Sequence, residues 1–129
     1  MTINIDSHYA LDLLRQEVRG HEDYVYDEKE NSFCHYIKDD RPSCLIGRAL
    51  HQAGVPIYVL TKLDELGAIS QASTVEHLAV NHVHMTAEAQ RVFSVAQDLQ
   101  DADRPWGNAL AAAHNTYARL CENEEAVSA

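Results

Sequence analysis

Residues 41–56 read RPSCLIGRALHQAGVP, and this stretch decides the fold. The pattern predicts a helix over Cys44–Ala53 that ends at the following glycine. Pro42 is tolerated near a helix start, and Ser43 can cap the free amides. At 100° per residue, the apolar face of this helix carries Leu45, Ile46, Ala49, Leu50 and Ala53. The opposite face carries Cys44, Gly47, Arg48 and His51. Because Gly47 makes that face narrow, we expect another backbone or a partner to approach it closely.

Amphipathic patterns predict further helices on both sides of this one. Asp6 or Ser7 can cap an N-terminal helix that ends at Gly20. Its apolar stripe consists of Ala10, Leu11, Leu14 and Val18. Four later helices are expected over Thr61–Leu66, from Ser73 or Thr74, from Thr86, and from Asp103 and Pro105 to about Cys121. In the last helix Trp106 lies on the apolar stripe, which predicts a place in the core.

Between the first two helices, two short runs are typical of β-strands. Tyr24–Tyr26 and Phe33–Ile37 are rich in aromatic and β-branched residues. The polar residues 27–32 predict the turn between them, and Asp39 and Asp40 are expected to end the second strand. The predicted fold is therefore mainly α (α+β), with an N-terminal helix, one antiparallel β-hairpin and then about five helices around a single core. Residues 1–123 form one globular domain in this prediction, and residues 124–129 form a frayed tail.

The chain has 129 residues and a formal net charge of −10. Because no basic patch interrupts this acidity, we expect no direct binding to nucleic acid. The longest unbroken apolar stretch, Ala109–Ala113, is far too short to span a membrane. The first residues show no basic region typical of a signal peptide, and three cysteines fit a reducing compartment. The expected location is therefore the cytoplasm.

Three segments carry a resemblance to a known group of proteins. Residues 24–37 combine YVY, a polar turn and CHYI, residues 41–56 contain PSCLIGRAL, and residues 96–110 read AQDLQDADRPWGNAL. In this order they resemble small uncharacterised proteins of actinobacteriophages and actinobacteria, in which a hairpin precedes a P-S-C-L-x-G helix and a late Q-D…W-G-x-A helix closes the chain. Residues 99–103 replace a shorter, glycine-bearing link in those relatives. The resemblance implies a small cytoplasmic protein made by a phage or prophage, and it implies no known activity or catalytic residue.

Two sets of side chains have spacings that zinc can use: His77, His82 and His84, and Cys34, Cys44 and His51. Neither set includes a C-x₂-C pair or an H-E-x-x-H motif, and His82 to His84 fits a loop between two helices. We therefore predict no metal and no cofactor, with both sets kept as alternatives. Cys44 stands at a helix start, where a thiol can be reactive, but its expected role is that of a small buried residue under the hairpin. No catalytic residue is predicted.

The candidate ligand- or partner-binding residues surround the predicted hairpin and the helix that follows it. They are Tyr24, Tyr26, Tyr36, Cys44, Arg48, His51 and Trp106. If their face is exposed, Arg48 is the side chain best able to hold an anion. If the face packs under the hairpin, we expect Arg48 to pair with Asp39, Asp40 or a hairpin glutamate. Trp106 can fill the core or anchor a partner.

Acidic side chains crowd the predicted hairpin and form a candidate partner surface: Glu22, Asp23, Asp27, Glu28 and Glu30. The leading hypothesis is a non-enzymatic accessory protein that binds a host or phage macromolecule, with a protein as the expected partner. The alternatives are a small-molecule or minor enzymatic pocket between hairpin and helices, and an acidic mimic of DNA that occupies a basic surface. The alanine-rich last helix can pack closely against a second copy, so a homodimer is also expected.

Overall fold

The computed structural model describes residues 2–27 and 35–128, with the backbone alone for residues 123–128. Within these residues it contains six helices and four short strands. The helices are α1 (Ser7–Val18), α2 (Leu45–Gln52), α3 (Ile57–Leu66), α4 (Ala72–Val80), α5 (Ala87–Asp101) and α6 (Trp106–Ser128). The strands are β1 (Ile3–Ile5), β2 (Ile37–Lys38), β3 (Arg41–Pro42) and β4 (Val83–Met85). The prediction of a mainly helical protein with an N-terminal helix and one small antiparallel hairpin is confirmed.

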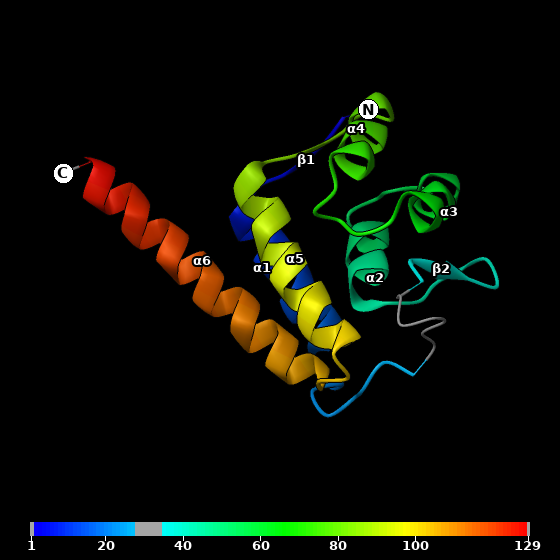
Figure 1. The fold of residues 1–129 in the computed structure, drawn as a ribbon, viewed down its shortest axis with the longest axis horizontal. Helices are drawn as coiled ribbons and strands as arrows, with labels where there is room; N and C mark the ends of the chain where they lie inside the picture. The colour runs from blue at the N-terminus through cyan, green and yellow to red at the C-terminus, as the bar shows by residue number, and fades with distance from the viewer. Residues whose placement is uncertain (1, 28–34, 129) are drawn as a thin grey trace.

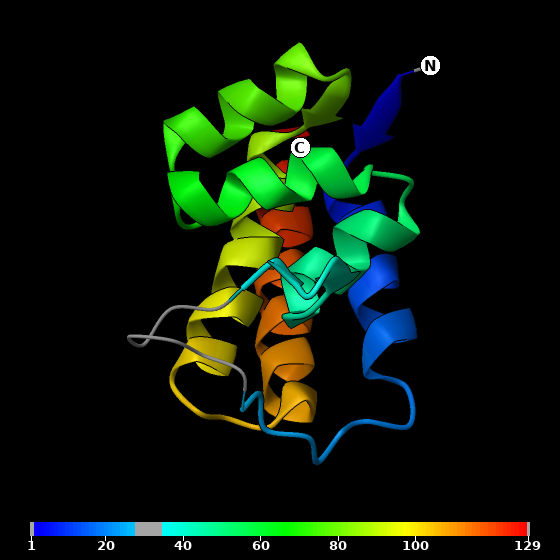
Figure 2. The same ribbon diagram turned by 90° about the vertical axis from the view of Figure 1, so that its right-hand side faces the viewer.

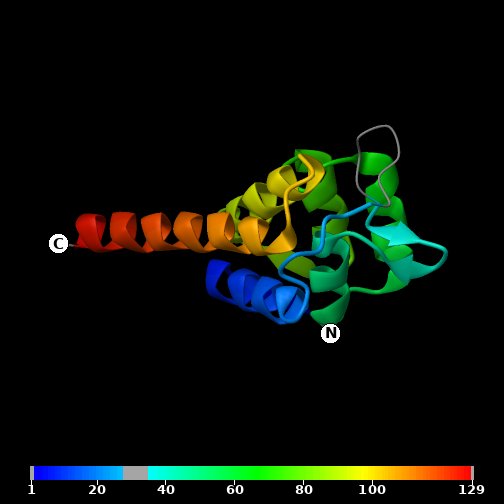
Figure 3. The ribbon, with the colours of Figure 1, turned by 90° about the horizontal axis from the view of Figure 1, so that it is seen from below.

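Three helices form the body of the molecule. α1, α5 and α6 pack against one another, and Figure 2 shows them roughly upright, with α3 and α4 crossing them. α2 packs on α1 and α5, and the hairpin of β2 and β3 lies beyond it (Figure 1). The C-terminal end of α6 extends past the other helices (Figure 3). None of the helices in the described part of the chain is long and apolar enough to cross a bilayer.

The buried side chains form one cluster to which all six of these helices contribute. Its largest fully buried members include Trp106, Tyr26, Tyr36 and Phe93. The apolar face predicted for α2 is buried at Leu45, Ile46, Ala49 and Leu50, and Ala53 packs against the cluster from its edge. Each large apolar side chain removed from water contributes roughly 1.5–3 kcal/mol, so this cluster is the main source of stability.

Two of the predicted helix caps are confirmed. The side chain of Asp6 accepts a hydrogen bond of 2.8 Å from the backbone amide of Tyr9 at the start of α1. The hydroxyl of Thr86 accepts one of 3.0 Å from the amide of Ala89 at the start of α5. In both places a side-chain oxygen satisfies an amide that the first helical turn leaves free.

Three helix boundaries differ from the prediction. α3 begins at Ile57, one turn before the expected start at Thr61, because Pro56 immediately before it has the extended backbone of an N-cap. α4 begins after Gln71 with no side-chain cap, and the hydroxyl of Thr74 instead donates to the carbonyl oxygen of Ala68. α6 continues to Ser128, two turns beyond its expected end near residue 121.

The hairpin lies further along the chain than its predicted strands. Ile37 pairs with Pro42 and Lys38 with Arg41, so the turn consists of Asp39 and Asp40, with φ of 54° and 60°. A two-residue hairpin turn requires positive φ at both positions, and aspartate tolerates this conformation better than most residues. Residues 24–26 form no strand, which corrects the first half of the predicted hairpin. Most of its predicted turn, with Phe33 and Cys34, lies outside the described residues.

A parallel strand pair joins the N-terminal segment to the connection between α4 and α5, and it was not predicted. β1 pairs with β4 in the register Ile3 with Val83 and Ile5 with Met85. His84 therefore lies on a strand, which corrects the expected loop at this position. The chain enters β4 through His82, whose φ is 64°.

Candidate functional site

The start of α2 is fixed by side chains from three parts of the chain. Cys44 is the N-cap, and its sulfur accepts a hydrogen bond of 3.4 Å from the amide of Gly47. The amide of Leu45 donates to Oε1 of Gln100 on α5 at 2.7 Å. Ser43, the predicted cap, instead shares a hydrogen bond of 2.7 Å with the hydroxyl of Tyr26. The amides of Leu45 and Gly47, two of those that the first turn of α2 leaves free, therefore already have acceptors within the protein.

Gly47 lets the segment before the hairpin lie directly on α2. A Cβ added at Gly47 would stand 2.8 Å from the Cα of Tyr36 and 2.9 Å from its carbonyl carbon. The same segment receives hydrogen bonds from the start of the helix, from the amide of Ser43 to the oxygen of Tyr36 at 3.0 Å and from the amide of Cys44 to the oxygen of His35 at 2.8 Å. The close backbone approach expected at Gly47 is confirmed.

Arg48 is held in place on the same face of α2. Its Nε donates to the carbonyl oxygen of Ser43 at 3.0 Å. Its guanidinium lies over the ring of Trp106, 5.4 Å from the centroid, in a cation–π arrangement. Within the described residues no ion pair joins Arg48 to Asp39 or Asp40, two of its predicted partners. The hairpin glutamates, Glu28 and Glu30, lie outside the described residues.

Two adjoining hollows open between the hairpin and α2. The first has a volume of about 470 Å³ and is lined by Lys38, Asp39, Arg41, Pro42, Ser43 and Arg48. The second has a volume of about 530 Å³ and is lined by Glu17, Arg41, Pro42, Arg48, His51 and Gln52. Because they share Arg41, Pro42 and Arg48, we treat them as one feature, the hairpin–α2 groove. Lys38, Arg41 and Arg48 give the first hollow three positive charges against the one negative charge of Asp39.

Most of the predicted binding residues lie in the core instead of lining this groove. Tyr26, Tyr36, Cys44 and Trp106 are at most 2% exposed. Tyr24 is half-buried and packs edge-on against Trp106, with ring centroids 4.7 Å apart. Of the predicted set, Arg48 and His51 border the hollows. Of these aromatic residues, Trp106 contacts the guanidinium of Arg48, and Tyr24 packs against Trp106.

The backbone of the segment after α1 caps α6. The amide of Trp106 donates to the oxygen of Tyr24 at 2.8 Å, and the amide of Gly107 donates to the oxygen of Glu22 at 2.9 Å. A Cβ at Gly107 would lie 2.9 Å from that oxygen of Glu22. The W-G pair thus allows this segment to cross the helix start at close range and to fix Trp106 under Arg48.

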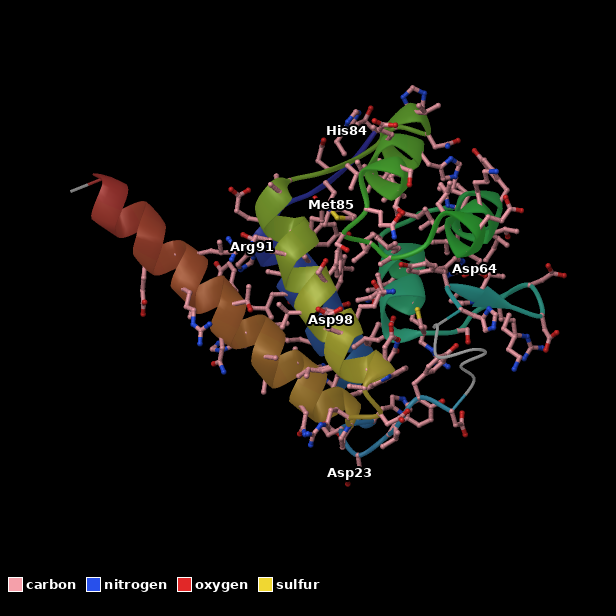
Figure 4. All side chains as sticks on the ribbon, in the orientation of Figure 1. Asp23, Asp64, His84, Met85, Arg91 and Asp98 are labelled. Carbon is pink, nitrogen blue, oxygen red and sulfur yellow. The ribbon has the colours of Figure 1, made fainter. Side chains whose placement is uncertain are left out.

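The predicted acidic surface is described in part. Glu22, Asp23 and Asp27 are exposed, and Asp23 lies at the far end of the molecule from His84 (Figure 4). Glu22 has a lowered pKa because its carboxylate accepts hydrogen bonds from its own amide and from that of Gly20. Asp27 accepts a hydrogen bond of 3.1 Å from the hydroxyl of Tyr24. Two of the three described carboxylates therefore have partners within the chain.

The histidines and cysteines do not assemble within the described residues. No group of three His, Cys, Asp or Glu side chains there could hold a metal ion. His77 contacts the carbonyl oxygen of Val59 through Nε2 at 3.2 Å, which ties α4 to α3. Cys44 is completely buried, and Cys34 lies outside the described residues.

Several polar residues that position the groove were not predicted from the sequence. The carboxylate of Asp64 on α3 accepts hydrogen bonds from the amides of Tyr36 at 2.6 Å and Ile37 at 3.4 Å, and it lies beside β2 (Figure 4). Its pKa is raised because the cost of burial exceeds the effect of these amides and of nearby His35. On α5, Gln97 and Gln100 are buried and bond Tyr36 and Leu45. They follow Phe93 and Ala96 by four residues, so they lie on the buried stripe of α5. This spacing is the signal in the sequence that could have identified them.

Comparison with known proteins assigns neither a family nor a function to the chain. No protein-family model, no curated protein and no solved structure matches the chain.

Proposed function

We propose that the chain is a non-enzymatic accessory protein of a phage or prophage, and that it binds a host or phage protein through the hairpin–α2 groove. The observation that carries this proposal is the gathering of Lys38, Arg41 and Arg48 around one hollow of a chain whose net charge is −10. In a chain this acidic, a local excess of positive charge beside a hollow indicates recognition of an acidic group.

The groove is also preorganised in part, which lowers the entropy cost of binding. Lys38 and Arg41 stand directly opposite each other on β2 and β3, next to a two-residue turn. Arg48 is held by Ser43 and Trp106. The guanidinium of Arg48 is therefore oriented before the partner arrives, and the hairpin fixes the backbone positions of Lys38 and Arg41.

The charge distribution favours a protein partner over nucleic acid. The net charge of −10 repels a polyanion such as DNA or RNA along its whole length. A single acidic side chain in the first hollow, in contrast, meets the three cations that line it. Charges further away than about 8 Å are screened at physiological salt. An acidic segment of a protein meets this requirement.

One alternative has support of its own. The volume of the first hollow, about 470 Å³, lies within the usual size of small-molecule sites, roughly 300–1,000 Å³. A polar metabolite with an acidic group therefore remains the second candidate ligand. The alternative of an acidic mimic of DNA has less support, because Glu22 and Asp27 have hydrogen-bond partners within the chain.

Affinity capture with three forms of the full chain tests the proposal. The first is the wild type, the second is Lys38→Gln combined with Arg41→Gln, and the third is the control Arg91→Gln. All three positions are exposed, and Arg91 lies on α5 on the side away from the hairpin (Figure 4). From an actinobacterial lysate we expect a protein that the wild type and the control retain and the double variant loses. A partner retained equally by all three forms, or no partner at all, contradicts the proposal.

A further inference from the structure

We infer that the first hollow of the hairpin–α2 groove is a binding site for an oxyanion, a carboxylate or phosphate group, with Arg48 as its principal ligand. This inference rests on the proposed function and names the chemistry of the group that the partner inserts. Three observations support it. They are the N–H donors of Arg48 that remain for a ligand, the charges around Arg48, and the acceptors that the amides of Leu45 and Gly47 already have.

Arg48 has one edge of its guanidinium available for a ligand. Arginine has five N–H donors in a fixed plane. The Nε–H bonds Ser43, and the face of the group lies over Trp106. Its terminal nitrogens have no acceptor in the part of the chain that the structure describes. A planar fork with two parallel N–H groups matches the two oxygens of a carboxylate or phosphate, so the remaining edge suits a bidentate ion pair.

Lys38 and Arg41 supply the rest of the positive charge. Both side chains are exposed, and neither forms an ion pair within residues 2–27 and 35–122. Their backbones pair directly across the hairpin, which places both residues at the same edge of the hollow. Asp39 is the one acidic residue among the six that line it. Three cations against one carboxylate leave an excess of two positive charges for a ligand of opposite sign.

The nearby helix start does not provide the binding groups. The amides of Leu45 and Gly47 already donate to Gln100 and to Cys44. An oxyanion in the hollow is therefore held by side-chain cations and not by the amides of Leu45 and Gly47. Affinity should consequently respond to substitutions of Lys38 and Arg41, even though neither residue belongs to the helix.

The single tryptophan of the chain reports on this site directly. Trp106 lies under the guanidinium of Arg48, so an anion that pairs with Arg48 changes the electric field at the indole ring. The experiment titrates the purified full chain with inorganic phosphate, and separately with a capped triglutamate peptide, at constant ionic strength set with sodium chloride. Tryptophan fluorescence is recorded at each step. The probe that binds more tightly identifies the source of the oxyanion as phosphate or carboxylate.

We expect a saturable change in fluorescence with at least one probe. In the double variant Lys38→Gln and Arg41→Gln, the dissociation constant should rise about tenfold or more, since each lost charge-assisted hydrogen bond weakens binding by about that factor. The control Arg91→Gln should bind as the wild type does. No saturable change with either probe, or equal affinity in the double variant, overturns the inference.

The two proposals fail in different ways. If neither anion binds but the wild type still captures a partner that the double variant loses, the groove contacts protein without an oxyanion site. If an anion binds and no partner is captured, the site stands and the proposed function is wrong. Because the double variant alters exposed side chains, its far-UV circular dichroism and its melting temperature should match those of the wild type.

Discussion

The guanidinium of Arg48 lies 5.4 Å from the centre of the Trp106 ring, and its Nε is bound to the carbonyl oxygen of Ser43. This contact connects α2, which carries Arg48, with the start of α6, which carries Trp106. The buried tryptophan fixes the orientation of a cation that borders the groove. A core residue thereby determines the geometry of the candidate site.

Replacing Arg48 with lysine keeps the charge and removes the stacked plane and the Nε–H donor. We expect Arg48→Lys to lower the free energy of unfolding by about 1 kcal/mol, because the cation–π contact and one hydrogen bond are weakened. Urea denaturation measures this loss. The matched control, Arg91→Lys on the exposed face of α5, should change stability by less than about 0.5 kcal/mol. Equal stability of both variants would contradict the role given to Trp106.

Gly47→Ala tests the close approach of Tyr36 to α2. The added Cβ would lie 2.8 Å from the Cα of Tyr36, and backbone atoms cannot move aside cheaply. We expect a loss of about 1–3 kcal/mol in unfolding free energy, although alanine is the better helix former. Thermal and urea denaturation measure it, with Ala111→Ser at an exposed position of α6 as the control. A variant more stable than the wild type would show that the segment does not lie on α2.

Gln100→Met tests the polar contact that α5 makes with the start of α2. Methionine has a similar shape but no amide oxygen, so the buried amide of Leu45 loses its acceptor. The expected cost is about 1–3 kcal/mol. Hydrogen exchange should show faster exchange at the Leu45 amide in the variant. The exposed Gln71, which makes no side-chain bond to the start of α4, provides the control, and Gln71→Met should leave both the stability and this exchange rate unchanged.

Asp64 predicts a specific dependence of stability on pH. Burial raises its pKa above the ordinary value of 3.8, so the folded state binds the proton more tightly than the unfolded state does. Its contribution to stability is therefore complete below pH 3.8 and is lost as the pH rises through the raised pKa. The free energy of unfolding of the wild type minus that of Asp64→Asn should therefore fall as the pH rises over that interval.

Urea denaturation at a series of pH values measures this difference. Asp98→Asn is the matched control, since Asp98 is an exposed carboxylate on α5 (Figure 4). If this difference rose with pH instead, the amides of Tyr36 and Ile37, and not burial, would control the pKa of Asp64.

Local signals in the sequence predicted much of the helical framework. Asp6 and Thr86 cap α1 and α5 because a side-chain oxygen at those positions serves its own helix and needs no distant partner. The narrow face at Gly47 predicted a close backbone, and the apolar stripe of the last helix predicted a buried Trp106. Each of these depends on residues within a few turns of one another.

The groove could not be derived from the sequence in the same way. Tyr24–Tyr26 has a strand-like composition, but Tyr26 is used for side-chain packing and a bond to Ser43, and no strand forms there. The true hairpin depends on Asp39 and Asp40, which were interpreted as the end of a strand although both tolerate the positive φ of a turn. With the hairpin misplaced, the meeting of Lys38 and Arg41 with Arg48 was not foreseen.

The parallel pair of β1 and β4 was missed for a different reason. Its partners are far apart in the sequence, and each strand has only three residues. The alternation in Ile3–Ile5 is too short to specify a strand without knowledge of its partner. Long-range pairing of this kind is determined by tertiary packing.

Nuclear magnetic resonance of the ¹⁵N-labelled chain tests the proposed groove most directly. Inorganic phosphate or the capped triglutamate peptide is added at constant ionic strength, and the signals that move are assigned to residues. We predict that they are the amides of residues 38–41 and 43, the side-chain Nε–H of Arg48 and the indole N–H of Trp106. Shifts that gather instead at residues 20–27 or along α6, or no shifts with either anion, would contradict binding at the hairpin–α2 groove.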